Sequence, residues 1–257
     1  QTLSLTLYAY GMAESFRFVL PPELLETSWF LPMVAAGIII LVSAVAGKST
    51  ELTLKLQRPI MVLIAASLFS LFIGTFSSHE PLTMAEAVPP VEDVPFWAVF
   101  AVFFPAVTGI LSGVSLSGDL ADPRKAIPRG VLAAVLIGFI VYLIVPVALY
   151  MSAGPNLLKQ DTLVWLKVAW VPWLILPGLW GAILSSAFGS ILSAPRTLQA
   201  LALDRLAPKI FTKTHDKTGE PVLGLYVSAA VALAAVSLGN LNMVAEWLTV
   251  FFLTTYG

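Results

Sequence analysis

Residues Pro95–Pro123 read PFWAVFAVFFPAVTGILSGVSLSGDLADP, an apolar stretch of membrane-spanning length that Pro105, Gly109, Gly113 and Gly118 interrupt. In hydrocarbon each unpaired backbone amide or carbonyl costs several kcal/mol, so a broken helix persists there only where it lines a cavity or binds something. Many secondary transporters use discontinuous helices near the membrane midplane to present carbonyls to cations and helix N-termini to anions. The stretch therefore predicts part of an ion or solute transporter.

The composition of the whole chain also indicates a membrane protein. The 257 residues are 58% hydrophobic and 11% charged, with a mean hydropathy of +0.89, which lies outside the range of soluble domains. The lack of cysteine excludes disulfides and thiolate chemistry. His79 and His215 are far apart in polar loops, so we expect no metal centre. We also expect no cofactor and no nucleic-acid partner. Because Gln1 is not a start residue and Gly257 interrupts an apolar run, we expect the chain to be a fragment.

Eight apolar runs approach the ~20 residues that a spanning helix needs. They are Thr2–Leu20, Ser28–Ala46, Pro59–Phe76, Pro95–Gly118, Gly130–Ala153, Leu174–Leu206, Pro221–Leu238 and Met243–Tyr256. The loop Lys159–Trp170 is expected to hold a short interfacial helix. We expect an all-α polytopic membrane protein in which residues 1–257 form one transmembrane domain.

The distribution of positive charge predicts the orientation of these runs. If each run crosses once, one side collects Lys48, Lys55, Arg58, Arg124, Lys125, Arg129, Arg196, Arg205, Lys209, Lys213 and Lys217. The other side collects only Arg17, Lys159 and Lys167. The loop before the broken run carries Glu80, Glu86, Glu92 and Asp93 and no Lys or Arg. The richer side is therefore predicted to be cytoplasmic.

The break itself offers groups for both signs of ion. Pro105 lacks an N–H and frees a carbonyl one turn earlier, and Gly109 lets the chain leave helical geometry. The outer half-helix would end in free carbonyls beside the Thr108 hydroxyl, which suits a dehydrated cation. The inner half-helix would begin with free amides, which suit an anion. The alternative is a proline kink whose freed groups are satisfied by neighbouring helices.

A second candidate site lies in Gly181–Ala194, which reads GAILSSAFGSILSA. Ala182, Ser185 and Ser186 fall on one helical face at i, i+3 and i+4. Two hydroxyls and a carbonyl so placed can ligate a small hard cation such as sodium. The alternative is helix packing, because small residues recur every fourth position along this segment.

Acidic residues give a weaker signal. Glu14 is a carboxylate near the middle of an apolar run, where such groups usually line polar cavities; the alternative is a local pair with Arg17. Asp122-Pro123 is typical of a helix start. Ser117-Gly118-Asp119 loosely resembles an intramembrane aspartyl protease, but the sequence has no second intramembrane aspartate to complete that chemistry. We therefore expect no enzyme.

Three motifs resemble those of one transporter family. They are FFPAVTGILSGVSLSGDLADPRKAIPRG, then LSSAFGSILSAPRTLQALALDRLAP, then FFLTTY. In order and content they resemble the cation–chloride cotransporters of the amino acid–polyamine–organocation superfamily, and the resemblance runs from Tyr8 to Tyr256. It implies a LeuT-like inverted-repeat core of ten helices, of which this chain holds helices 3 to 10 with helix 6 broken. Helices 1 and 2 and the C-terminal part would be missing.

The same resemblance implies ion sites. For potassium it implies Tyr8, Pro105 and Thr108. For chloride it implies Gly109, Ile110, Leu111 and Tyr256. For sodium it implies Ala182, Ser185 and Ser186. Glu14 corresponds to an outer-gate acid. Tyr8 matches the potassium-using members, and the serine pair matches the sodium-using members.

We therefore expect a symporter of sodium, potassium and chloride that works by alternating access. Its partners would be inorganic ions and the lipid bilayer. We expect a multi-pass protein of the plasma membrane or the bacterial inner membrane, and a homodimer of the whole protein. The alternatives are an amino-acid or organic-cation permease of the same fold and a non-transporting membrane subunit.

Overall fold

The computed structural model describes residues 1–21, 27–77, 94–115, 117–120, 122–161, 163–215 and 219–256. Several predicted features fall outside them: His79, the acidic loop from Glu80 to Asp93, Lys217, and the side chains of Ile110, Leu111 and Tyr256. The chain divides into two compact units. Unit 1 comprises Gln1–Gln57, Phe96–Pro128 and Ile183–Gly257, and unit 2 comprises Arg58–Pro95 and Arg129–Ala182.

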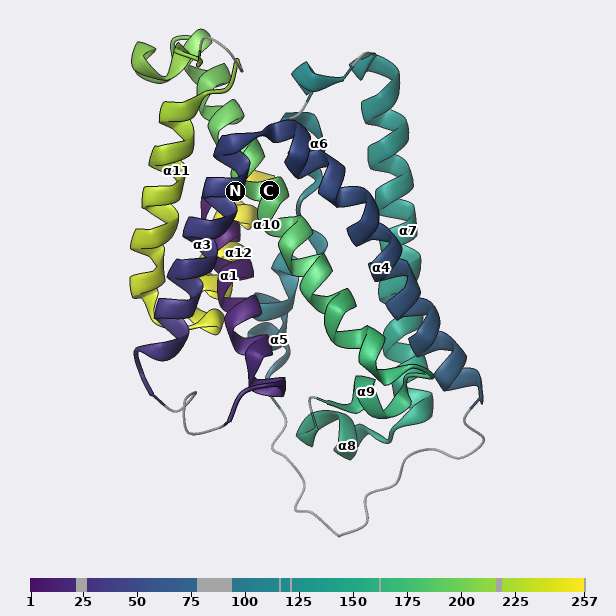
Figure 1. Ribbon diagram of the computed structural model, residues 1–257. Coiled ribbons are helices and arrows are strands. Elements are labelled where there is room, and N and C mark those ends of the chain that lie inside the picture. The colour runs from purple at the N-terminus through teal and green to yellow at the C-terminus, as the bar shows by residue number, and fades with distance from the viewer. Residues whose placement is uncertain are drawn as a thin grey trace. The chain divides into compact units, whose positions relative to one another are not determined.

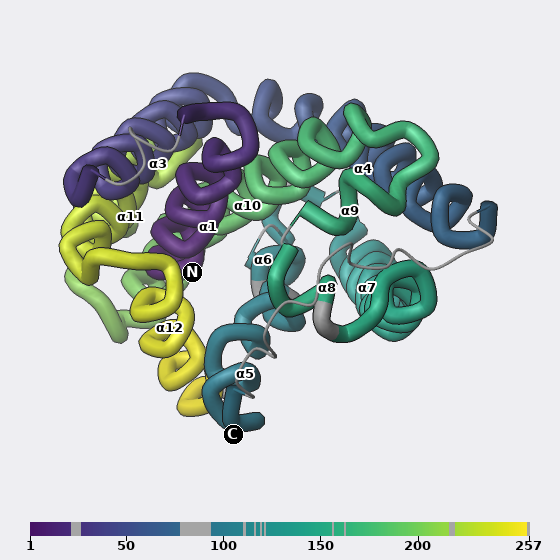
Figure 2. The backbone as a smooth tube through the Cα atoms, turned by 90° about the horizontal axis from the view of Figure 1, so that it is seen from below, coloured from purple at the N-terminus to yellow at the C-terminus, as the bar shows by residue number. Residues whose placement is uncertain are grey.

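Unit 1 is a cluster of helices packed around α1. Its elements are α1 (Thr2–Ser15), η1 (Phe16–Phe18), α3 (Phe30–Lys48), the start of α4 (Thr50–Ser77), α5 (Phe96–Phe103), η2 (Phe104–Val107), α6 (Ile110–Ser115), η3 (Ser117–Asp119), the start of α7 (Pro123–Ser152), the later part of α10 (Ile175–Leu203), η5 (Lys209–Thr212), α11 (Val222–Ala235), η6 (Val236–Leu238) and α12 (Leu241–Tyr256). Helix α1 packs against α3, α11 and α12, and α12 packs against α5 (Figures 1 and 2).

Two hydroxyls bind α1 to the end of α11. Thr6 Oγ1 donates to the Ala232 carbonyl at 2.9 Å, and the Tyr10 phenol donates to the Val236 carbonyl at 2.6 Å. Carbonyls in the last turn of a helix lack an intrahelical donor. Both side chains are fully buried, so these bonds satisfy polar groups that lipid cannot satisfy.

A small residue allows close approach between α10 and α11. A Cβ on Gly224 would lie 3.0 Å from Pro195 Cβ and 3.1 Å from Pro195 Cα. Small residues let membrane helices pack at this distance. The contact holds the later part of α10 within unit 1.

Unit 2 combines long helices with two short ones. It holds the later part of α4, most of α7, α8 (Pro155–Gln160), α9 (Val164–Val168), η4 (Pro172–Leu174) and the start of α10. The segment after α9 is bound to α4: Trp170 N donates to the Ser70 carbonyl at 2.9 Å, and Val171 N donates to Ser70 Oγ at 2.8 Å. A Cβ on Gly74 would lie 1.9 Å from the Val168 carbonyl oxygen. Only glycine fits there without moving this backbone.

A polar turn connects α8 and α9. Asp161 accepts from Leu163 N at 2.7 Å and from Lys167 Nζ at 2.5 Å. The hydrogen bond from Lys167 holds the pKa of the Asp161 carboxyl below its ordinary value. Helix α9 supplies the short helix expected between Lys159 and Trp170, and α8 precedes it.

The all-α polytopic fold is confirmed, and several helix limits differ from the predicted runs. Among the described residues, five segments are long and apolar enough to cross a membrane: Phe30–Lys48, Thr50–Ser77, Phe96–Ser115, Pro123–Ser152 and Pro172–Leu203. Val222–Leu238 and Leu241–Thr255 are shorter apolar helices. The count of eight spans stays a prediction.

Two helices begin earlier than their apolar runs. Helix α4 begins at Thr50 rather than Pro59, because a Glu51–Lys55 pair at 2.7 Å supports a polar first turn and Pro59 removes only one helical bond. Helix α7 begins at Pro123, as the Asp122-Pro123 pair predicts, with Ala126 N donating to the Asp122 carbonyl at 2.9 Å.

Candidate ion-binding site

The predicted break is present between α5 and α6. Helix α5 ends at Phe103, and the chain continues as the 3-10 turn η2. Thr108 is fully extended, with φ −97° and ψ −178°. Gly109 has φ +111°, a conformation that a residue with a Cβ rarely adopts. The helical hydrogen-bond pattern is therefore interrupted between η2 and the first turn of α6.

The oxygens expected to face a cation lie next to each other. Thr108 Oγ1 donates to the Pro105 carbonyl at 2.7 Å, and Thr108 N donates to the same oxygen at 3.2 Å. Pro105 is buried and Thr108 is half-buried. A hydroxyl that donates its only hydrogen keeps its lone pairs for another partner. Thr108 therefore satisfies the Pro105 carbonyl and still offers an oxygen.

The backbone amides expected to face an anion lie at the start of the second half-helix, α6. Ser112 N donates to the Gly109 carbonyl at 3.0 Å. The N–H groups of residues 109–111 precede this bond, in the positions of a helix start where backbone donors have no partner within the helix. The side chains of Ile110 and Leu111 lie outside the described residues, but the amides expected to act belong to the backbone.

Helix α12, which ends at Tyr256, packs beside the break. It contacts α5 and η2, and Thr249 Oγ1 donates to the Ala101 carbonyl at 2.6 Å. The element that carries Tyr256 is thus a neighbour of the broken helix. The contact of the phenol itself stays a prediction.

The serine pair lies in the middle of α10 and is half-buried. Ser185 Oγ donates to Gln57 Oε1, and Gln57 Nε2 donates to the Ser185 carbonyl at 3.3 Å. Gln57 belongs to α4. Ser185 and Ser186 belong to unit 1 and Ala182 to the end of unit 2, all within the one continuous helix.

The packing alternative also has support along α10. Ser193 is fully buried, and its Oγ lies 3.5 Å from that of Ser112 in α6. A Cβ on Gly181 would lie 3.3 Å from Ile60 Cγ2. The small residues Gly181 and Ser193, which precede and follow the serine pair along α10, therefore allow close packing with neighbouring helices. Ser185 differs from them because its hydroxyl bonds an amide side chain.

The two sites expected in α1 have different surroundings. Tyr8 is half-buried and packs against the core cluster of unit 1, which also holds Tyr10. Glu14 pairs with Arg17, with 2.6 Å between Oε2 and Nε. The local pair weighed from the sequence is therefore present. A gating role for Glu14 stays a prediction.

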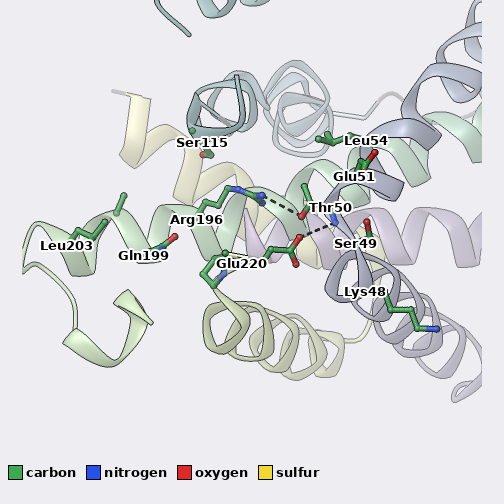
Figure 3. Close-up of a pocket in the computed structure, with 14 residues that line it drawn as sticks. Lys48, Ser49, Thr50, Glu51, Leu54, Ser115, Arg196, Gln199, Leu203 and Glu220 are labelled. Atoms are coloured by element: carbon green, nitrogen blue, oxygen red, sulfur yellow. Dashed lines mark hydrogen bonds between the residues drawn. The ribbon is translucent and has the colours of Figure 1, made fainter. Parts of the chain in front are cut away.

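The sequence did not reveal a cavity of about 620 Å³ in unit 1 (Figure 3). The start of α4, the later part of α10 and the segment before α11 line it. Arg196 Nη2 donates to Thr50 Oγ1 at 3.5 Å, and Thr50 N donates to Glu220 Oε1 at 3.0 Å. Lys48 and Arg196 both belong to the positive cytoplasmic set, so the cavity lies at the predicted inner end of unit 1.

Comparison with known families identifies the chain. The family model described as amino acid permease matches residues 27–257. The chain belongs to the amino acid permease family. This family has the LeuT-like fold that the resemblance of the three motifs implies, and the chain is a multi-pass membrane protein.

Individual relatives of this permease-family chain belong to one solute carrier family. Solute carrier family 12 member 8 of Mus musculus is 30% identical over 100% of this chain and 38% of its own length. Solute carrier family 12 member 2 of Danio rerio is 29% identical over 99% of this chain and 28% of its own length. Solute carrier family 12 member 1 of Rattus norvegicus is 30% identical over 85% of this chain and 25% of its own length.

These matches fit the predicted relationship to the cation–chloride cotransporters. The relatives are transporters rather than enzymes. The chain spans between a quarter and two fifths of the length of these relatives.

Proposed function

We propose that this chain forms the ion-binding part of a symporter that couples chloride transport to sodium and potassium by alternating access. The observation that carries the proposal is the break at Thr108-Gly109, where the paired oxygens of Thr108 and Pro105 directly precede the first residues of a new helix. Such a junction serves ions of both signs at one level of the membrane. Relatives in solute carrier family 12 support the chloride-coupled class.

The potassium site is proposed at the end of the first half-helix. Pro105 would supply its carbonyl and Thr108 its hydroxyl, with the phenol of Tyr8 as a third oxygen. Oxygen dipoles of this kind replace the hydration shell of a potassium ion. The Thr108–Pro105 hydrogen bond supports the proposal because it holds the two oxygens side by side. On ion binding the hydroxyl hydrogen of Thr108 would turn away, and the ion would take its place on the Pro105 carbonyl.

The chloride site is proposed at the start of the second half-helix. The amides of Gly109, Ile110 and Leu111 would donate to the anion, with the phenol of Tyr256 as a fourth donor. The positive φ of Gly109 and the packing of α12 against η2 support this arrangement. Helix N-termini attract anions through their free amides and dipole.

The sodium site is proposed on α10, with the Ala182 carbonyl and the hydroxyls of Ser185 and Ser186 as ligands. Glu14 would act at the outer gate, where its pair with Arg17 can open. The cavity at Thr50 and Arg196 would be the inner vestibule. It offers charges of both signs, which suits the exit of cations together with anions.

If two chlorides travel with one sodium and one potassium, transport moves no net charge. The sodium gradient would then drive uptake. We propose that the whole protein is a homodimer of the plasma membrane, or of the inner membrane of a bacterium.

An amino-acid or organic-cation permease is the second candidate. The description of the matching family favours it. An amino acid or organic cation would need a larger binding cavity beside the break, where the side chains of Thr108 and Tyr8 are expected to lie. The experiment that separates the two candidates is isotope uptake in cells expressing the protein. Removal of sodium, potassium or chloride in turn is expected to abolish uptake of the other two ions. Uptake of an amino acid that needs no chloride would support the second candidate instead.

A further inference from the structure

The hydroxyl of Ser185 behaves differently from most other hydroxyls in the described helices of this chain. Thr75 Oγ1 donates to the Leu71 carbonyl of its own helix at 3.0 Å, and Ser152 Oγ donates to the Ala148 carbonyl of its own helix at 2.9 Å. Backbone bonding of this kind is the usual choice of a helical serine or threonine in a membrane. Ser185 instead donates out of α10 to the side chain of Gln57.

The second bond of the pair fixes the direction of the first. The Ser185 carbonyl can only accept, so the amide nitrogen of Gln57 must face it, at 3.3 Å. The amide oxygen of Gln57 then faces the hydroxyl, and the hydroxyl must donate. Because a hydroxyl has one hydrogen, this arrangement turns the lone pairs of Ser185 Oγ away from Gln57.

We propose that Gln57 is a positioning residue for cation binding: it holds the Ser185 hydroxyl with its hydrogen on Gln57 and its lone pairs directed at the ion. This inference rests on the proposed sodium site on α10. Without Gln57, the hydroxyl would bond back to its helix or turn its hydrogen toward the cation, and either change weakens an oxygen ligand. Gln57 thereby makes sodium binding depend on contact between α4 and α10.

The test is a double-mutant cycle read as the sodium concentration for half-maximal uptake. Gln57→Leu keeps the approximate size of the side chain and deletes the acceptor. We expect it to raise the sodium requirement by about 3- to 10-fold, as the loss of one neutral hydrogen bond implies. The potassium and chloride requirements and the amount of protein at the cell surface should stay unchanged.

The Ser185→Ala and Ser186→Ala backgrounds decide how Gln57 acts. If Gln57 acts through the Ser185 hydroxyl, Gln57→Leu adds nothing in the Ser185→Ala background. In the Ser186→Ala background, which is the matched control, it should still multiply the sodium requirement by about 3- to 10-fold. An equal multiplication in both backgrounds would overturn the inference.

A second variant keeps the inference testable if Gln57→Leu does not reach the membrane. Gln57→Glu retains an acceptor for the hydroxyl and loses the amide donor. We expect its sodium requirement to equal that of the wild type or to fall below it. A loss like that of Gln57→Leu would assign Gln57 to helix packing. If Ser185→Ala alone leaves sodium dependence intact, the proposed sodium site fails together with the inference. If Ser185→Ala raises the requirement and Gln57→Leu does not, only the inference fails.

Discussion

Substitution of Gly109 by alanine is expected to weaken chloride binding without a steric clash. A Cβ at this position would have no atom within 4 Å, so the substitution meets open space. The φ of +111° is nevertheless a conformation that residues with a Cβ rarely adopt. The whole cost therefore comes from the backbone of the break.

The magnitude follows from that backbone strain. A non-glycine residue in a sparsely populated conformation costs about 1–3 kcal/mol. The chain can relieve the strain by turning the peptide groups around Gly109, which moves the amides away from the anion. If all of this strain opposes the chloride-binding geometry, the chloride concentration needed for half-maximal uptake should rise roughly 5- to 150-fold.

Chloride titration of uptake at saturating sodium and potassium measures this effect. Gly138→Ala in α7 is the matched control, because its Cβ also meets open space and its φ is not positive. We expect that control to leave the chloride curve unchanged. A normal chloride curve for Gly109→Ala at normal surface expression would refute the role of the break in anion binding.

Three further predictions concern other elements. Thr108→Ala removes the hydroxyl beside the Pro105 carbonyl and should raise the potassium concentration needed for half-maximal uptake by about tenfold. Tyr8→Phe should raise the same concentration. A shift in sodium dependence alone would mean that the potassium and sodium sites are assigned the wrong way round. Tyr256→Phe keeps the ring and deletes one donor to a charged partner, so the chloride requirement should rise by at least roughly tenfold, and an unaltered curve would remove Tyr256 from the site. Gly74→Ala places a Cβ 1.9 Å from the Val168 carbonyl oxygen and should destabilise the protein by about 1–3 kcal/mol or more. We expect this loss as a lower melting temperature in detergent. An unchanged melting temperature would contradict the packing of α4 against α9 and the segment after it.

Local chemistry made the break and the helix start at Pro123 predictable. Pro105 and Gly109 act on their own backbone, one by removing a donor and the other by permitting a positive φ. Asp122 and Pro123 likewise define a helix start from two adjacent residues. Features of this kind depend on a few neighbouring positions, so the sequence is enough to locate them.

Contacts between distant positions could not be predicted in the same way. Gln57 and Ser185 are 128 residues apart, and the residues next to Gln57 in the sequence do not indicate which helix its side chain contacts. The network of Arg196, Thr50 and Glu220 was missed for the same reason. The start of α4 at Thr50 was missed because hydropathy marks where lipid begins rather than where the helix begins.

Coupled flux in reconstituted vesicles tests the central claim most directly. The protein is placed in vesicles that contain a chloride indicator, with the membrane potential held at zero and an inward sodium gradient imposed. The account predicts that chloride accumulates above its equilibrium level only when potassium is also present, and that sodium accumulates only when chloride is present. The account would be contradicted if the chloride concentration inside the vesicles did not respond to the sodium gradient and an amino acid or organic cation accumulated instead.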